Sequence, residues 1–358
     1  MQQHPFPPPL DGKTGWPWDF KPEKVSVNFD LPRVTIVTPS YNQAVYLEEA
    51  IRSVLLQGYP NLEYFILDGG STDGSVEIIK KYEPWLAGWV SEKDNGQGNA
   101  INKGFSQATG EWMGWLNSDD CFAPYALFNL LYTAHVSQAK FVYGASVQFG
   151  MTSEIMPFPR MKIPGPRAFD FEIIRMVDII DQPATLWNRE IYEQCGPLAD
   201  DLRYVFDWDF FIRCAQKNKG ALCAHPIAAY RFHEANKTTE LNFKRDEELM
   251  FISLKYLPDH LRRKLIRVLP IIKVLKKIAL AKVRGTWLSR FIAKIALAPF
   301  RLCWFLHLFG LPMELWVMYG FGNCMDSKLM PFKIATSPAH TVADSFSCFP
   351  DVWKFPNQ

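Results

Sequence analysis

The 358-residue sequence predicts an α/β fold, with a mostly parallel sheet flanked by helices and a basic, apolar helical extension after it. Three observations predict this class. Apolar, β-branched runs alternate with stretches of helical periodicity from residue 34 onward. Polar clusters directly follow several of these runs, where a parallel sheet presents the carboxyl ends of its strands. After residue 257, basic side chains are instead interleaved with leucines and isoleucines.

The first half predicts strands and helices in alternation. A strand at residues 34–38, helical spacing up to residue 55 and a second strand at residues 62–67 form a parallel βαβ unit. Helices are expected at residues 76–82 and 97–107, and a buried strand at residues 111–116. Pro124 suits the first turn of a further helix that continues through Leu131.

The second half is more mixed. We expect a strand at residues 141–149, a short helix at residues 189–195 and a helix that begins near Asp207. These elements should complete the sheet and supply the other wall of a cleft.

Three regions follow from this pattern. Residues 1–31 form a proline- and aromatic-rich arm, which should be irregular and pack Trp16 and Trp18 on the body. Residues 32–257 form the main domain, and residues 258–358 form the C-terminal extension.

Gly12-Lys13-Thr14 imitates the end of a phosphate loop, but Pro7 stands where the first glycine should be and no strand precedes it.

Composition narrows the class of protein. Hydrophobic residues make up 48% and charged residues 21%, which is typical of a folded globular chain. The seven cysteines include no C-x-x-C pair, which favours free thiols in a reducing compartment. The N-terminal segment lacks the apolar core of a signal peptide, so we expect a cytoplasmic protein.

The extension has its own electrostatic character. No acidic residue lies between Asp259 and Glu314, whereas 12 lysines and arginines do. The uncharged run at residues 302–313 is shorter than the roughly 18 to 20 residues needed to span a bilayer. We therefore expect residues 259–322 to make peripheral contact with an anionic membrane. A solvated helix face is an alternative, and nucleic acid is not an expected partner.

The residues after the first predicted strand are not those of a dinucleotide-binding loop. Residues 39–43 read PSYNQ where G-x-G-x-x-G would be needed, which disfavours a dehydrogenase. Asp68, followed by two glycines, can face a ligand and bind a base or ribose, although it also suits a turn. Asp94 lies in a turn sequence and allows the same two interpretations.

The segment LNSDD at residues 116–120 is the most specific cluster. The adjacent carboxylates of Asp119 and Asp120 repel one another unless a cation lies beside them. A hard divalent ion that bridges diphosphate oxygens would satisfy both, whereas a helix cap ahead of Pro124 explains only one. We therefore expect Mn²⁺ or Mg²⁺ here.

Two further positions are candidates for chemistry. Asp207 and Asp209 flank Trp208 at a predicted helix start, where one carboxylate could be a general base and the other a helix cap. His233 could contact phosphate or metal, with Lys237 as a compensating charge, although a single histidine is more often structural.

Five ordered motifs resemble glycosyltransferase family 2, whose fold is the Rossmann-like GT-A fold. They are VTIVTPSYNQ, the helix at residues 51–57, LDGGSTDGS, residues 92–104 and LNSDD. The resemblance covers about residues 32–240. It implies an inverting enzyme that uses a nucleotide diphosphate sugar, usually with manganese or magnesium. The Trp16-Pro17-Trp18 arm is similar to that of bacterial members that build surface polysaccharides.

The resemblance also implies roles for individual residues. The donor-nucleotide pocket would be lined by Pro39, Tyr41, Asn42, Asp68, Asp94, Asn117 and Ser118. The metal would be held by Asp119, Asp120 and His233. FDWDFFIR is similar to the family's downstream acidic motif, which makes Asp207 the general base, and Gln182, Trp208 and Asp209 are the acceptor-side candidates.

The expected reaction is inverting transfer of a hexose, most simply from a UDP-sugar, to a glycan or lipid-linked acceptor. The protein would work at the cytoplasmic face of the inner membrane. Asn99 and Asn117 replace aspartates of many relatives, so the alternative is a catalytically inactive nucleotide-sugar or glycan binding protein of the same fold. A nucleotidyltransferase is a third hypothesis, which release of a nucleotide diphosphate rather than pyrophosphate would exclude.

Overall fold

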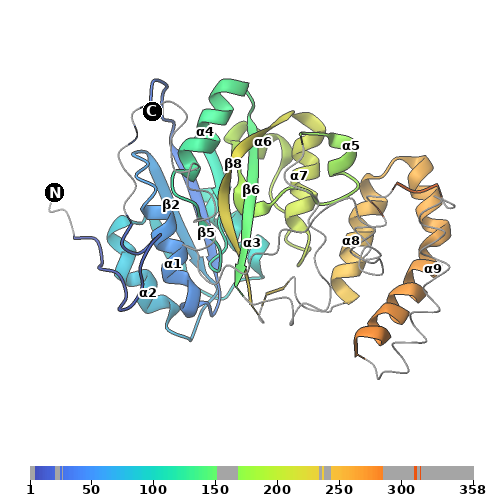
Figure 1. Cartoon of the computed structure of the whole chain (residues 1–358), viewed down its shortest axis with the longest axis horizontal. Coiled ribbons are helices and arrows are strands. Elements are labelled where there is room, and N and C mark those ends of the chain that lie inside the picture. The colour runs from blue at the N-terminus through green and yellow to red at the C-terminus, as the bar shows by residue number, and fades with distance from the viewer. Residues whose placement is uncertain are drawn as a thin grey trace.

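The computed structural model describes residues 5–20, 25, 27–150, 168–233, 236–237, 243–284, 310–312 and 315. Across this part of the chain a single eight-stranded sheet runs in the order β3-β2-β1-β4-β7-β6-β8-β5. Helices lie on both sides of the sheet (Figure 1). Four of the seven neighbouring strand pairs are parallel. The predicted α/β class with a mostly parallel sheet is confirmed.

The first half alternates as predicted. Its strands are β1 (Val34–Ser40), β2 (Leu62–Asp68), β3 (Gly88–Ser91) and β4 (Trp112–Trp115). Its helices are α1 (Ala44–Leu55), α2 (Ser75–Tyr82) and α3 (Gln97–Gln107), with a 3-10 turn at Glu83–Trp85. Ser40 lies opposite Asp68, and Asp68 lies opposite Ser91. The carboxyl ends of these three strands therefore meet at one edge of the sheet.

The second half mixes strand directions. Its strands are β5 (Cys121–Phe122), β6 (Phe141–Gly150), β7 (Thr185–Asn188) and β8 (Gly220–Phe232). Its helices are α4 (Ala126–Ser137), α5 (Phe171–Ile174), α6 (Arg189–Cys195) and α7 (Phe206–Lys217), and a 3-10 turn spans Gln182–Ala184. β7 is antiparallel to β4 and β6, whereas β6 and β8 are parallel. The strand expected at residues 141–149 and the helices expected at residues 189–195 and near Asp207 are confirmed.

The predicted start of α4 is wrong. Pro124 lies ahead of the helix, which begins at Ala126 and continues to Ser137. Tyr125 takes a left-handed conformation, with φ at 60°, and this conformation cannot continue a right-handed helix.

The two faces of the sheet have separate apolar cores. Tyr64 and Ile66 of β2 join a cluster with α1, α2 and α4, whereas Phe65 and Leu67 join a cluster with α3, α6 and α7. Successive side chains of a strand point to opposite faces, so an apolar strand serves both cores. Gly104 lets α3 approach β1, because a Cβ there would lie 2.6 Å from Val37 Cγ1.

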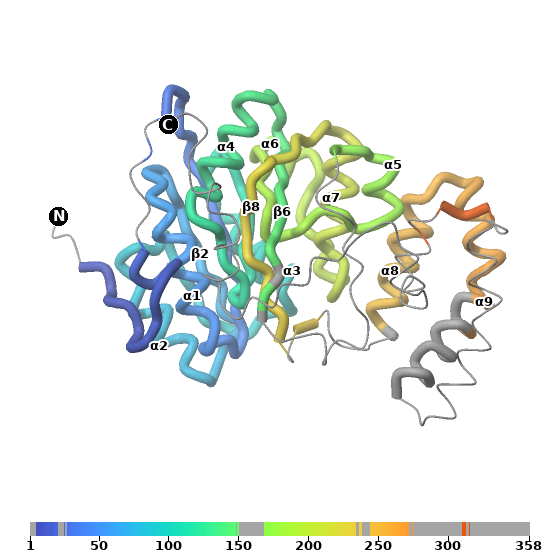
Figure 2. Tube along the Cα trace, viewed as in Figure 1, coloured from blue at the N-terminus to red at the C-terminus, as the bar shows by residue number. Residues whose placement is uncertain are grey.

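The N-terminal arm packs on the body, as predicted for its tryptophans. Trp16 and Trp18 are buried, and the indole N–H of Trp16 donates to the Phe122 carbonyl over 2.7 Å. The buried guanidinium of Arg52 in α1 donates to the carbonyls of Pro7, Pro17 and Trp18. Figure 2 shows the dark blue arm beside α1 and α2.

Two helices follow the sheet, α8 (Phe243–Tyr256) and α9 (Asp259–Arg284). Leu261, Leu265 and Val268 of α9 are buried, so this stripe packs against protein. No helix in the described ranges is long and apolar enough to cross a membrane. Residues 285–309, 313–314 and 316–322 of the expected membrane-contact segment lie outside the described residues. Membrane contact therefore stays a prediction.

Candidate active site

The loops after β1 and β2 are tied together at the carboxyl edge of the sheet. The backbone N–H of Asn42 donates to Ser71 Oγ over 2.7 Å, and Asn42 Oδ1 accepts from Thr72 N over 2.9 Å. Asn42 has a φ of 52°, which asparagine tolerates better than most residues. Asp73 Oδ2 accepts from Ala44 N over 2.9 Å, so the two helix starts are joined as well. The role of Asn42 seen here is to fix the loops.

Tyr41 and Asp94 gather around Gly69. A Cβ on Gly69 would lie 3.0 Å from Asp94 Oδ2 and 3.3 Å from Tyr41 Cδ2. The Tyr41 side chain is 61% exposed, which leaves an aromatic face beside a carboxylate. Asp94 Oδ1 accepts from Gly96 N over 2.8 Å, and this contact leaves Oδ2 toward Gly69. A flat, hydrogen-bonding ring such as a nucleobase suits this pair.

The other predicted nucleotide-pocket residues are less exposed. Asp68 is 2% exposed, and its carboxylate accepts from Gly70 N, Ser71 N and Ser91 Oγ. It therefore shapes the loop that carries Gly69. Pro39 is buried near the end of β1, and Ser118 is buried in the turn after β4. Direct contact of these three side chains with a nucleotide stays a prediction.

Asp119, Asp120 and His233 come together, although more than a hundred residues separate the aspartates from the histidine. His233 Nε2 lies 3.0 Å from Asp119 Oδ2, and the His233 ring lies 4.6 Å from the Tyr46 ring. Asp120 is 1% exposed; Oδ1 accepts from Arg231 N over 3.0 Å. Burial and the neighbouring Asp119 carboxylate raise the pKa of Asp120 well above its usual value.

The donor set fits a hard divalent cation only in part. Among the described residues, no group of three His, Cys, Asp or Glu side chains is arranged to hold an ion. Asp119 Oδ2 and His233 Nε2 nonetheless suit one ion, because neighbouring ligands of an octahedral ion lie about 3 Å apart when each bond is about 2.1 Å. Magnesium-type sites commonly use one or two carboxylates plus substrate phosphates. Asp120, whose oxygens face protein donors, supports the site from behind.

Asn117 belongs to a chain of side-chain hydrogen bonds. Lys237 Nζ donates to Gln97 Oε1, Gln97 Nε2 donates to Asn117 Oδ1, and Asn117 Nδ2 donates to Gln182 Oε1 over 3.0 Å. Gln182 Nε2 then donates to the Trp115 carbonyl at the end of β4. An ionised aspartate at position 117 could not donate to Gln182. The asparagine is therefore what this chain of bonds requires.

Three carboxylates act on one lysine. Burial and the charge of Arg203 lower the pKa of Lys237, although the charges of Asp119, Asp207 and Asp94 oppose this shift. Asp207 lies in the first turn of α7, where its Oδ1 accepts from Trp208 N over 2.8 Å. Burial raises the pKa of Asp207 despite that bond and the charges of Arg245 and Lys237. The charges of acidic residues from three separate segments thus act on one cation.

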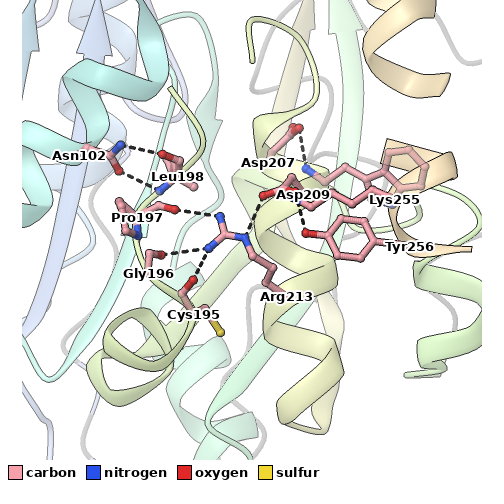
Figure 3. Close-up of polar contacts among 11 residues, drawn as sticks. Asn102, Cys195, Gly196, Pro197, Leu198, Asp207, Asp209, Arg213, Lys255 and Tyr256 are labelled. Carbon is pink, nitrogen blue, oxygen red and sulfur yellow. Dashed lines mark hydrogen bonds and ion pairs between the residues drawn. The ribbon is translucent and has the colours of Figure 1, made fainter. Parts of the chain in front are cut away.

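Asp209 lies in a different environment from Asp207 (Figure 3). Its Oδ2 accepts from Arg213 Nε over 2.8 Å, and its Oδ1 accepts from Lys255 Nζ and Tyr256 Oη of α8. The same Arg213 donates to the carbonyls of Cys195 and Pro197. Asp209 therefore joins α7, α8 and the turn after α6.

The Trp208 side chain is also interior. It is buried, and its indole N–H donates to the Ile174 carbonyl over 2.7 Å. Its predicted acceptor-side role, like that of Asp209, stays a prediction. Both residues hold α7, and thus Asp207, in place.

Comparison with known protein families identifies the domain that carries this site. The sequence model named Glycosyl transferase family 2 matches residues 35–196, which span β1, the LNSDD segment and α6. Residues 35–196 form a glycosyl transferase family 2 domain. The matched residues carry Tyr41, Asp94, Asp119 and Gln182, so the carboxyl edge described above is the edge of a glycosyltransferase domain.

Two named relatives of this chain are bacterial proteins. An uncharacterized glycosyltransferase of Nostoc sp. is 38% identical over 219 residues, which cover 57% of this chain and 66% of that protein. The chain thus spans just under two thirds of that relative. The putative teichuronic acid biosynthesis glycosyltransferase TuaG of Bacillus subtilis is 38% identical over 92 residues, covering 25% of this chain and 36% of TuaG.

A solved structure shares the fold. The mannosyltransferase PcManGT from Pyrobaculum calidifontis, solved with GDP-Man and Mn²⁺, aligns with a TM-score of 0.52 at 20% identity. The alignment covers 86% of this chain and 90% of PcManGT. The GT-A fold is therefore confirmed.

Several polar residues of the site were not predicted from sequence. Gln97 bonds both Lys237 and Asn117, whereas the sequence shows it only as the first residue of a helix. Arg231 donates to Asp119 O over 2.9 Å, and its partner Glu49 lies in α1. A basic residue two positions before His233 was the only available signal.

Proposed function

We propose that this protein is an inverting glycosyltransferase that moves a sugar from a nucleotide diphosphate donor to a hydroxyl of a glycan or lipid-linked acceptor. One observation carries the proposal: the charges of Asp119, Asp207 and Asp94, from three separate segments, all act on Lys237, whose Nζ donates to Gln97 in the chain of hydrogen bonds that reaches Asn117 at the carboxyl edge of the sheet. This edge is where open α/β sheets bind ligands. The arrangement offers a pocket for the nucleobase, a region for the diphosphate and a general base for the acceptor hydroxyl in one place.

The donor would bind with its nucleobase on the exposed ring of Tyr41. Asp94 Oδ2, which faces Gly69 beside Tyr41, would accept a hydrogen bond from the base edge. The diphosphate would then lie toward Asp119, His233 and Lys237, whose ammonium offsets part of its negative charge. We expect a UDP-sugar as the donor, whereas the PcManGT complex contains GDP-Man.

Asp119 and His233 would hold a Mn²⁺ or Mg²⁺ ion, with Asp120 behind them. When bound, such an ion supplies positive charge that stabilises the leaving diphosphate. Lys237 adds a fixed positive charge in the same region, held by Gln97.

Asp207 would act as the general base. It takes the proton of the acceptor hydroxyl while the new bond forms between that oxygen and the anomeric carbon. The bond from the anomeric carbon to the phosphate oxygen breaks, and the nucleotide diphosphate leaves with the bonding electrons. Attack on the face opposite the leaving group inverts the anomeric configuration. The raised pKa of Asp207 suits a group that must accept a proton.

Acceptor identity is proposed from bacterial relatives. TuaG is named for teichuronic acid biosynthesis, which supports a glycan acceptor. Gln182, which accepts from Asn117 Nδ2, is the acceptor-side candidate that belongs to the chain of side-chain hydrogen bonds. Membrane contact through residues 259–322 and a cytoplasmic membrane-face location are part of the proposal.

Donor binding can be tested by thermal shift with UDP-, GDP- and dTDP-sugars, each with and without Mn²⁺. We expect one nucleotide series to raise the Tm, more so with Mn²⁺. Tyr41→Ala should weaken that binding about tenfold, because base–aromatic stacking contributes about 1–3 kcal/mol. Val136→Ala, which truncates an exposed side chain on α4, is the control and should bind normally. If Tyr41→Ala bound the nucleotide as tightly as Val136→Ala, the placement of the nucleobase on Tyr41 would be wrong.

A further inference from the structure

We propose that the N-terminal arm positions the metal ligand Asp119 and its neighbour Asp120 through a relay of three side chains, Trp18, Glu49 and Arg231. The inference rests on the proposed function, since it takes Asp119 as a metal ligand. The arm lies outside the residues matched by the family model. Its effect on the site is therefore a property of this chain that the family match does not supply.

The relay is continuous in the structure. Trp18 Nε1 donates to Glu49 Oε1 over 3.0 Å, and Glu49 Oε2 pairs with Arg231 Nη2. Arg231 Nε donates to the Asp119 carbonyl over 2.9 Å, and Arg231 N donates to Asp120 Oδ1 over 3.0 Å. One residue of β8 thus holds the backbone of one aspartate and the carboxylate of the next.

Arg231 is held from its other sides as well. Its guanidinium lies 4.7 Å from the Tyr46 ring and 4.3 Å from the Phe149 ring. The Tyr46 ring also contacts His233. Asn236 Nδ2 donates to the Arg231 carbonyl over 2.6 Å, and Asn236 Oδ1 accepts from His233 N. The same cluster therefore orients both Asp119 and His233.

The positive charge of Arg231 explains why the relay needs the Glu49 carboxylate. A guanidinium beside Asp119 and Asp120 repels a divalent cation, and the Glu49 carboxylate offsets that charge at contact distance. The Glu49 and Arg231 side chains are each 13% exposed, so water screens the pair poorly. Without Glu49, Arg231 would keep its charge and lose the partner that directs it away from the metal ligands.

Trp18 connects this pair to the arm. Its indole lies over Arg52, which also holds the carbonyls of Pro7, Pro17 and Trp18. The arm is thereby fixed on α1 three residues from Glu49. The indole N–H then limits the positions that Glu49 can take.

The test is direct Mn²⁺ binding, measured by electron paramagnetic resonance of free Mn²⁺ on the full chain, with near-UV circular dichroism as a check of folding. Glu49→Gln should weaken Mn²⁺ binding about 10- to 100-fold, the usual range for residues that support a metal ligand. Trp18→Phe, which removes only the N–H donor, should weaken it several-fold. Glu49→Asp, which keeps the charge, should bind better than Glu49→Gln.

Glu63→Gln is the matched control. Glu63 is also a partly buried carboxylate, but it lies near the start of β2 and accepts from Thr35 and Thr109. This variant should bind Mn²⁺ normally even if its Tm falls. If Glu49→Gln does not fold, Trp18→Phe and Glu49→Asp decide the question.

Wild-type affinity in folded Glu49→Gln and Trp18→Phe would overturn the relay while leaving the metal assignment intact. A wild-type protein that binds no Mn²⁺ would overturn the metal assignment itself, and the relay with it.

Discussion

Asp207→Asn is expected to lower kcat by about 10²- to 10⁴-fold, the usual contribution of a general base. Asparagine has the same shape and can keep the bond from Trp208 N, which is 2.8 Å from Asp207 Oδ1. It cannot take a proton from the acceptor hydroxyl. Donor binding should be retained, because Asp94, Tyr41 and Lys237 are unchanged. The measurement is kcat alongside the donor Kd for both proteins.

Asp201→Asn is the control for this substitution. Asp201 is exposed in the segment before α7, so the same chemical change there should leave kcat unchanged. The pH profile adds a second readout. Since burial raises the pKa of Asp207 above its ordinary 3.8, against the charges of Arg245 and Lys237, activity should fall on acidification at a pH above 3.8. If Asp207→Asn kept the wild-type kcat, the general base would have to be another residue.

Asp209→Asn should lower the free energy of unfolding by about 3 kcal/mol, the cost of leaving a buried ionic partner without its counter-charge. The Asp209 side chain is only 2% exposed, and it joins Arg213 to α8 through Lys255 and Tyr256. Lys255 is 44% exposed, which keeps the expected loss at the low end of the range for such pairs. Urea unfolding at pH 7 measures it, with Glu190→Gln as the control.

The control pair, Lys140 and Glu190, is exposed on both sides and should contribute under about 1 kcal/mol. The pH dependence follows from the pKa of Asp209. Burial would raise that pKa, but hydrogen bonds from Lys255 and Tyr256 and the charge of Arg213 hold it below the ordinary 3.8. The stabilisation is therefore present above pH 3.8 and is lost as the pH falls through the lower, folded-state value. A loss below 1 kcal/mol at pH 7 would contradict this account.

The fold was largely predictable because its signals are local. Strand ends at Ser40 and Asp68 follow apolar runs in the sequence, and alternating side chains of those runs fill both cores. The start of α4 was missed, because the left-handed backbone of Tyr125 has no marker such as glycine.

The site was predictable in its carboxylates and less so in their partners. Asp119 and Asp207 stand out by their positions after a strand and at a helix start. The partners come from afar: Gln182 is 65 residues from Asn117, and Lys255 is 46 residues from Asp209. Such pairings depend on how the elements pack, so nothing in the local sequence around Asp209 distinguishes a residue that joins α7 to α8 from one that faces an acceptor.

The most direct test of the central claim is to identify what the protein releases from a nucleotide sugar. Purified protein, Mn²⁺ and the donor selected by thermal shift are incubated with candidate glycan or lipid-linked acceptors, and the products are separated by ion-exchange chromatography. We expect a nucleotide diphosphate, formed by wild type and nearly absent with Asp207→Asn. Release of pyrophosphate would indicate a nucleotidyltransferase, and donor binding without any release would indicate a binding protein of the same fold.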